Sequence, residues 1–124
     1  MEFTSRTLAD LVVATPIGRI DHGSAEQFKA ALAPLLDACT AGRGRIVLDL
    51  AGVDYISSVG LRVLMLAAKQ VKEQRGEMVI AGMQPVVREI FEISRFNFLF
   101  GSFSTVREAI AKLSPAAQAA FDGV

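Results

Sequence analysis

The chain has 124 residues, 52% of them hydrophobic, and its 13 Lys and Arg side chains balance its 13 Asp and Glu side chains. This length and composition predict one domain with a sizeable hydrophobic core. The zero formal net charge gives no general attraction to nucleic acid or to an anionic membrane surface, so we expect no nucleic-acid partner.

Targeting, redox and metal-binding signals are sparse. The polar first residues, 1–6, lack the pattern of a signal peptide, and the longest helical apolar run, 63–68, is far shorter than the roughly 20 residues that span a bilayer. The single cysteine, Cys39, cannot form an intramolecular disulfide, and no His/Cys cluster has metal-ligand spacing. We therefore expect a cytoplasmic protein with no metal site and no direct membrane insertion.

The first third of the chain predicts a hairpin followed by a helix. Residues 3–8 and 11–20 are rich in β-branched and apolar residues, which predicts two antiparallel strands. Ser24 with Gln27 three residues later is the pattern of a capping box at a helix start. Because proline removes a backbone donor inside a helix, Pro34 predicts a kink or a break in that helix.

A strand and a long helix follow. Residues 45–50 are apolar on both faces, which is typical of a central parallel strand. From about Ser58 to about Arg75 the apolar residues recur at helical spacing, with lysines near the end and Gly76 placed to stop the helix. This stretch predicts the main helix of the domain.

The last third predicts two more strands and two more helices. Residues 77–81 and 98–100 predict strands, Pro85 suits the first turn of a helix, and Thr105 with Glu108 forms a second capping box. The repeated strand–helix units predict an α/β domain with a mixed sheet of about four to five strands and about four helices. We expect this domain to occupy residues 1–113 and to be followed by a C-terminal tail, 114–124.

The most informative segment is Asp54 to Leu61, which leads from the apolar strand into the main helix. It places Ser57 and Ser58 where a helix exposes unpaired backbone N–H groups, a setting that favours an anionic group such as phosphate. One serine could simply cap the helix while the other lies exposed in the turn. Alternatively, a serine is phosphorylated, and Gly60 lets another backbone approach closely.

Enzymatic alternatives have little support in the sequence. Asp21 and Asp54 could form an acid pair, but each is expected in a turn, where Asp commonly bonds the local backbone. His22 is the only histidine, so the sequence gives little support for a Ser/His hydrolase site. No glycine-rich phosphate-binding loop of the Walker type is present. We therefore expect a protein that is not an enzyme and has no cofactor of its own.

The chain resembles the STAS-domain anti-sigma factor antagonists over nearly its whole length. The resemblance is carried by 18–21 before the first helix, 46–50, the serine-containing run 53–61, and 76–80. It implies a single STAS-like domain that binds an anti-sigma factor, a serine kinase of the histidine-kinase-like ATPase class, and thereby frees a sigma factor. Phosphorylation of a serine at the start of the second helix would end the binding, and a metal-dependent phosphatase of the PP2C type would restore it.

By this resemblance Ser58 is the phosphoacceptor. The residue before the acceptor is commonly Asp in the family and is Ser57 here, and the residue after it is Val59 rather than Ser, Thr or Ala, which leaves Ser57 as a rival acceptor. The residues implied to bind the partner are Asp21, Ser57, Ser58, Val59, Gly60 and Arg62.

STAS domains also resemble components of lipid-transport ABC systems, anion-transporter tails and signalling scaffolds. In those settings the domain would be a binding module without a serine cycle, and direct binding of a small ligand is a third possibility. Ser58 would then have no regulatory role.

Overall fold

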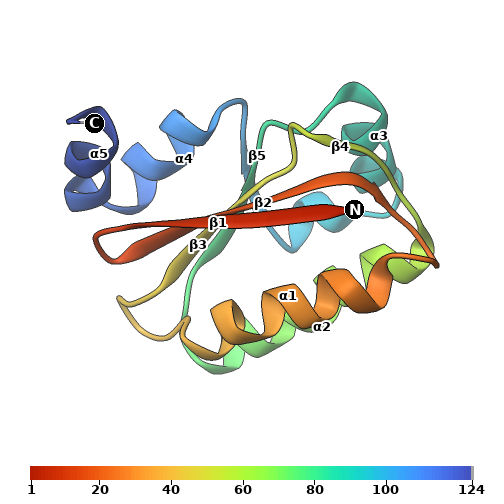
Figure 1. The fold of residues 1–124 in the computed structure, drawn as a ribbon, viewed down its shortest axis with the longest axis horizontal. Coiled ribbons are helices and arrows are strands. Elements are labelled where there is room, and N and C mark those ends of the chain that lie inside the picture. Colours follow the sequence, from red (N-terminus) through yellow and green to blue (C-terminus); the bar gives the residue numbers. More distant parts are fainter. Residues whose placement is uncertain (124) are drawn as a thin grey trace.

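The computed structural model describes residues 1–123, which form a mixed β-sheet with helices on both faces (Figure 1). The strands are β1 (Glu2–Leu8), β2 (Leu11–Ile20), β3 (Arg45–Asp49), β4 (Val53–Ile56), β5 (Met78–Ala81) and β6 (Gly101–Phe103). The helices are α1 (Ala25–Asp37), α2 (Ser58–Glu73), α3 (Pro85–Ile93), α4 (Val106–Leu113), α5 (Pro115–Asp122) and the short 3-10 helix η1 (Phe96–Phe98). The predicted α/β class and mixed sheet are confirmed.

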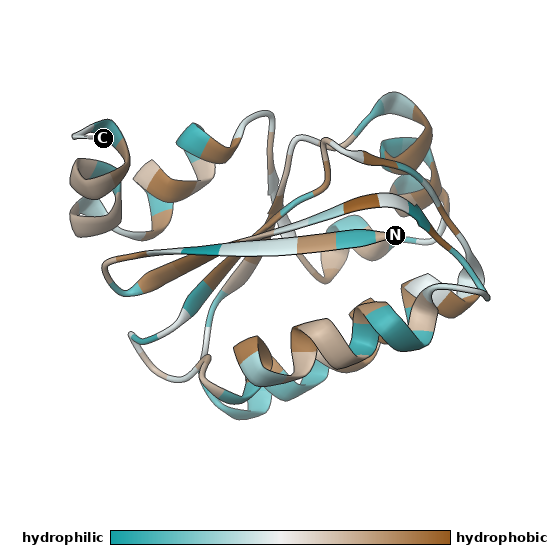
Figure 2. Cartoon of the chain, in the orientation of Figure 1, coloured by the Kyte–Doolittle hydropathy of each residue, from teal (hydrophilic) through white to brown (hydrophobic). Residues whose placement is uncertain are grey.

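The sheet has the strand order β1-β2-β3-β5-β6. β1 runs antiparallel to β2, and the other pairings are parallel. A larger core joins α1, α2 and α3 to one face of the sheet, with Phe28, Leu64 and Phe91 fully buried in it. A smaller core lies under α4 and α5 on the opposite face. Helices α1 and α2 carry alternating brown and teal bands in Figure 2, as expected of helices with one buried and one exposed side.

Strand β4 is the element that positions the candidate site. The first half of β2 pairs with β3, and after a register irregularity at Gly18, which has φ 110°, its last residues pair in parallel with β4. The N–H of Gly18 donates to the carbonyl of Gly52 at 2.9 Å and so supports this change of partner. The sequence analysis placed Asp54 in a turn, which is wrong, because Asp54 lies exposed in the middle of β4.

The N-terminal end of α1 differs from the prediction. Ser24 is the N-cap residue, but its hydroxyl makes no capping hydrogen bond and instead donates to the carbonyl oxygen of Arg19 at 2.7 Å. The predicted capping box with Gln27 is therefore wrong. Pro34 lies inside a helix that continues without a break to Asp37.

The C-terminal third contains the other corrections. The predicted strand at 98–100 is wrong, because residues 96–98 form η1 and the edge strand β6 begins at Gly101. Thr105 caps α4 as predicted, since its hydroxyl accepts the N–H of Glu108 at 3.1 Å. The residues expected to form a tail include α5, which raises the number of α-helices in 1–123 from about four to five.

Helix α5 is attached to the sheet through Ser114, which is almost completely buried. The Ser114 hydroxyl donates to a carboxylate oxygen of Asp10 at 2.6 Å and accepts the N–H of Ala117 at 3.1 Å as the cap of α5. The hydrogen bond from Ser114 lowers the pKa of Asp10 below its ordinary value, and the charge of Arg45 acts in the same direction. Stability that depends on ionised Asp10 is therefore present above the ordinary aspartate pKa and is lost as the pH falls through the lowered value.

We expect Ser114→Ala to lower the free energy of unfolding by about 1–3 kcal/mol at pH 7, because it removes both the cap and the partner of a carboxylate. The loss should shrink toward the contribution of the cap alone, about 1 kcal/mol, once Asp10 is protonated in acid. Urea unfolding at pH 7 and at acid pH measures both values. The matched control is Ser102→Ala at an exposed strand position, and an equal loss for Ser114→Ala at both pH values would contradict the prediction.

Candidate functional site

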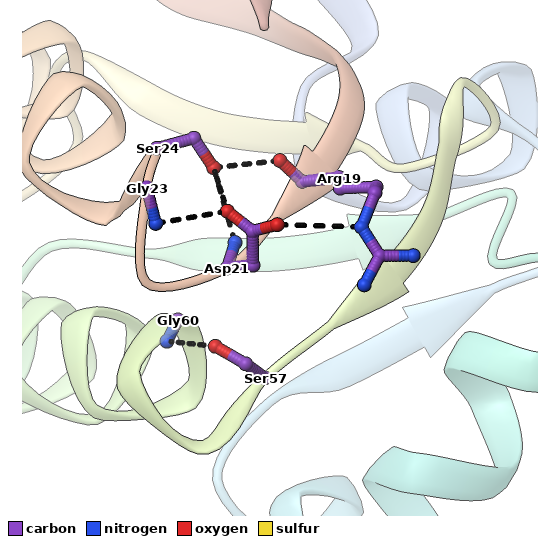
Figure 3. A network of polar contacts seen from close by, with 6 residues as sticks. All are labelled: Arg19, Asp21, Gly23, Ser24, Ser57 and Gly60. Carbon is purple, nitrogen blue, oxygen red and sulfur yellow. Dashed lines mark hydrogen bonds and ion pairs between the residues drawn. The ribbon is translucent and has the colours of Figure 1, made fainter.

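The candidate site lies where β2 and β4 end and α1 and α2 begin (Figure 3). Parallel strands end at the same edge of a sheet, so the loop after β2 and the loop after β4 emerge side by side. The backbone N–H of Ser57 donates to the carbonyl oxygen of Ile20 at 2.8 Å and joins the two loops directly. Asp21 and Ser57, distant in the sequence, therefore belong to one surface.

Ser57 is the N-cap of α2. Its backbone is extended, with φ −88° and ψ 173°, and its hydroxyl oxygen accepts the N–H of Gly60 at 3.3 Å. The side chain is partly buried. One of the two serines thus has the structural role that the sequence analysis considered, and that serine is Ser57.

Ser58 has a different environment. It is the first residue of α2, it is exposed, and its side chain forms no hydrogen bond with any other residue in the range 1–123. Val59 and Arg62 are exposed beside it, and Arg62 lies one helical turn further on the same side of α2 as Ser58. The hydroxyl of Ser58 is therefore accessible, and it lies next to helix N–H groups that lack intrahelical partners.

Gly60 is buried and faces the chain's own sheet. A Cβ atom at this position would lie 2.7 Å from Cγ2 of Ile20, 2.9 Å from the carbonyl oxygen of Ile20 and 2.9 Å from Cγ1 of Ile56. The missing side chain therefore serves the packing of α2 against β2 and β4. It does not serve the approach of a partner's backbone, as the sequence analysis had suggested.

Asp21 is fixed at the centre of the loop after β2. Its carboxylate accepts the N–H of Gly23 at 3.0 Å, the Ser24 hydroxyl at 3.3 Å and Nε of Arg19 at 3.3 Å (Figure 3). The guanidinium of Arg19 holds the pKa of Asp21 below its ordinary value, and the bonds from Gly23 and Ser24 add to this effect. Asp21 is thus an ionised, partly exposed group in a loop of defined shape.

Asp54 and His22 do not join this network. Asp54 is exposed on β4, so the acid pair that the sequence analysis considered is not part of the Asp21 network, and His22 is exposed in the loop between β2 and α1. Within residues 1–123 there is no group of three or more His, Cys, Asp or Glu side chains that could hold a metal ion. No helix in this range is both long enough and apolar enough to cross a membrane.

Arg19 and Tyr55 were not identified individually from the sequence as site residues. They are partners in the β2–β4 pairing, and the Arg19 guanidinium lies 4.5 Å from the centre of the Tyr55 ring, a distance typical of a cation–π contact. Arg19 therefore connects the Asp21 carboxylate to the surface of β4. Only the β2–β4 register reveals this contact, because nothing in the sequence pairs these two residues.

Comparisons with known proteins identify the family of this chain. The family model described as STAS domain matches residues 2–109. A protein of Bordetella bronchiseptica named as an anti-sigma factor antagonist, BtrV, is 42% identical over 111 residues, which make up 90% of this chain and 92% of that protein. This chain belongs to the STAS domain family.

Solved structures share the same STAS fold. A crystal structure of a Thermotoga maritima protein described as an anti-sigma factor antagonist has a TM-score of 0.81 at 20% identity, covering 90% of this chain and 93% of that one. The anti-sigma factor antagonist SpoIIAA of Bacillus has a TM-score of 0.73 in its unphosphorylated form, at 20% identity, over 90% of this chain and 95% of that one. The phosphorylated form has a TM-score of 0.68 at 20% identity, over 91% of this chain and 100% of that one.

We expect Gly60→Ala to destabilise this STAS domain by about 1–2 kcal/mol, because the new methyl group overlaps a backbone carbonyl that cannot move freely. This loss outweighs the gain of up to about 1 kcal/mol that alanine brings inside a helix. The matched control is Gly101→Ala, whose Cβ would make an ordinary contact of 3.5 Å with Cγ1 of Val79. Chemical denaturation measures both variants, and a Gly60→Ala protein as stable as the parent would refute the close-packing explanation.

Proposed function

We propose that this chain is an anti-sigma factor antagonist controlled by phosphorylation of Ser58. In its unmodified form it binds an anti-sigma serine kinase of the histidine-kinase-like ATPase class, and a sigma factor is released. The observation that carries the proposal is the contrast between adjacent hydroxyls: Ser57 is engaged in capping α2, and Ser58 is exposed without a partner among residues 1–123. The similarity to BtrV and the fold shared with SpoIIAA, which occurs in a phosphorylated form, support it.

Ser58 is favoured over Ser57 as the acceptor on physical grounds. A kinase must bring the γ-phosphoryl group of ATP in line with the attacking hydroxyl oxygen, which requires free access to that oxygen. The hydroxyl of Ser57 is partly buried and already accepts the N–H of Gly60 as the cap of α2. Phosphorylation of Ser57 would therefore have to replace the hydrogen bond that caps α2.

The proposed reaction forms a P–O bond between the γ-phosphorus of ATP and Oγ of Ser58. The bond to the bridging oxygen of ADP breaks, and the hydroxyl proton goes to a base of the kinase, which also supplies the Mg²⁺ site. This chain is the substrate and contributes no catalytic group. A PP2C-type phosphatase would reverse the modification by hydrolysis of the exposed phosphoester.

The effect of the phosphate should fall on the interface and leave the fold intact. The added charge of about −1.5 to −2 lies at the positive end of the α2 dipole, where it is stabilising. Arg62, one turn further along α2, provides a cation on the same side. A kinase surface that packs against Asp21, Val59 and Arg62 in the unmodified protein would meet a bulky dianion after phosphorylation.

We expect one phosphate to be added when the purified chain is incubated with ATP, Mg²⁺ and an anti-sigma kinase of this class from the same organism. Ser58→Ala should abolish the labelling and change the free energy of unfolding by no more than about 0.5 kcal/mol. Ser57→Ala should keep the labelling but lose about 1 kcal/mol of stability, because it removes the cap. Intact-mass and peptide mass spectrometry measure the labelling of each variant, and urea unfolding measures its stability.

Three results would overturn the proposal. Labelling that survives in Ser58→Ala and disappears in Ser57→Ala would move the acceptor to the capping residue. If the kinase binds the chain equally well before and after full phosphorylation of Ser58, phosphorylation does not control the binding. Stable association with a membrane transporter in place of the kinase would favour a role as a transporter-bound module.

A further inference from the structure

A second surface lies further along the same side of α2 as Ser58, toward the C-terminal end of the helix. There the C-terminal half of α2, strand β5 and the segment 98–100 enclose an open cavity of about 540 Å³. This volume falls in the range of about 300–1,000 Å³ that is typical of small-molecule sites. The side chains of Met78 and Phe100, which line the cavity, are each less than 10% exposed. The cavity therefore has an apolar lining that belongs to the core.

The mouth of the cavity is formed by apolar side chains that are unusually exposed. Met65 is 41% exposed, Leu99 is 48% exposed and Phe98 is 79% exposed, and all three line this one cavity. Isolated exposed apolar residues are ordinary, but a group of them around a concave site marks a binding surface. The apolar character thus continues from the floor to the rim.

Two positive charges complete the site. Lys69 and Lys72 follow Met65 at helical spacing, so all three lie along one side of α2 and line the cavity. Neither lysine forms an ion pair with another residue in the range 1–123. The acidic residue of the lining, Glu77, is already bonded through its carboxylate to Nε of Arg45 at 3.0 Å. The lysines are therefore available to an external anion.

We propose that this cavity binds a small amphipathic anion, namely a monocarboxylate with a medium-length aliphatic chain. Its carboxylate lies between Lys69 and Lys72, and its chain packs against Met65, Phe98 and Phe100. A second copy of this protein fits the surface less well. In a two-fold contact the same patch meets itself, so the lysines of both copies would gather in one interface, where like charges are unfavourable.

This proposal does not rest on the proposed function. Lys69 is eleven residues after Ser58, about 16 Å along the helix at 1.5 Å per residue, and the ligand site shares no residue with the site around Asp21. Binding can be measured without a kinase. Failure of one proposal therefore leaves the other unaffected.

The test is a titration of the full chain with sodium decanoate below its micelle-forming concentration, followed by amide NMR shifts. We expect saturable shifts confined to residues 65–72, 76–79 and 98–100. The double variant Lys69→Gln/Lys72→Gln should weaken the affinity for decanoate by about tenfold or more, as expected for loss of charge-assisted contacts. Decyltrimethylammonium, which has the same tail and the opposite charge, should bind the parent protein more weakly than decanoate.

Two control variants separate the contributions. Lys112→Gln removes a lysine from the last turn of a different helix, α4, and should leave the decanoate affinity unchanged. Phe98→Ser changes a side chain that contributes little to the core and should weaken binding without lowering the melting temperature. Proper folding of each variant is checked from its amide spectrum before titration.

The proposal is overturned if decanoate gives no saturable shifts, or if the lysine double variant binds it as tightly as the parent. Equal affinity for decanoate and decyltrimethylammonium would show that the lysines do not select for a negatively charged ligand. If analytical ultracentrifugation shows that the parent protein is a dimer and that the Phe98→Ser variant is a monomer, the surface binds a second copy of this chain. Binding to anionic phospholipid vesicles without binding to soluble decanoate would assign it to a membrane.

Discussion

The structure depends on the close contact between the start of α2 and the end of β2. The N–H of Ser57 reaches the carbonyl of Ile20 at 2.8 Å, and Gly60 packs where a methyl group would overlap that same carbonyl oxygen. This contact is possible because β2 pairs with β3 in its first half and with β4 at its last residues. One hydrogen bond and one missing side chain thus bring together two loops that are more than thirty residues apart.

The result is a surface whose two loops are held by the chain's own hydrogen bonds. The loop after β2 is held by the bonds of Asp21 to Arg19, Gly23 and Ser24, and the start of α2 is held by its Ser57 cap. Ser58 is a serine of this surface whose side chain forms no hydrogen bond with another residue in the range 1–123. Under the proposed function, a charge added there would change what a partner meets, while the hydrogen bonds that hold the two loops involve other side chains. The apolar cavity with its two lysines lies further along the same side of α2, so one side of the helix carries two chemically different sites.

The features that depend on local sequence patterns were predicted correctly. The features that depend on contacts between residues far apart in the sequence were not. The α/β class, the strand at 45–50 and the start of α2 near Ser58 follow from periodicity and capping residues, which act over a few positions. Strand β4 was missed because its four residues include an exposed Asp and pair only with the irregular end of β2. The role of Gly60 was misassigned for a similar reason, because the atoms that exclude a side chain there belong mainly to Ile20. Serine is a common helix-capping residue, but the hydroxyl of Ser24 donates to the backbone carbonyl oxygen of Arg19 instead of capping α1.

The most direct test compares the unmodified chain with the same chain carrying phosphoserine at position 58, by urea unfolding and amide NMR shifts. The phosphorylated protein should be as stable as the unmodified one or more stable by about 0.3–1 kcal/mol, because the charge lies at a helix N-terminus. Its shift changes should be confined to residues 19–24 and 57–62. A loss of more than about 1 kcal/mol, or shift changes throughout the core, would show that phosphorylation acts by disrupting the fold and would contradict a switch that acts on a preformed surface.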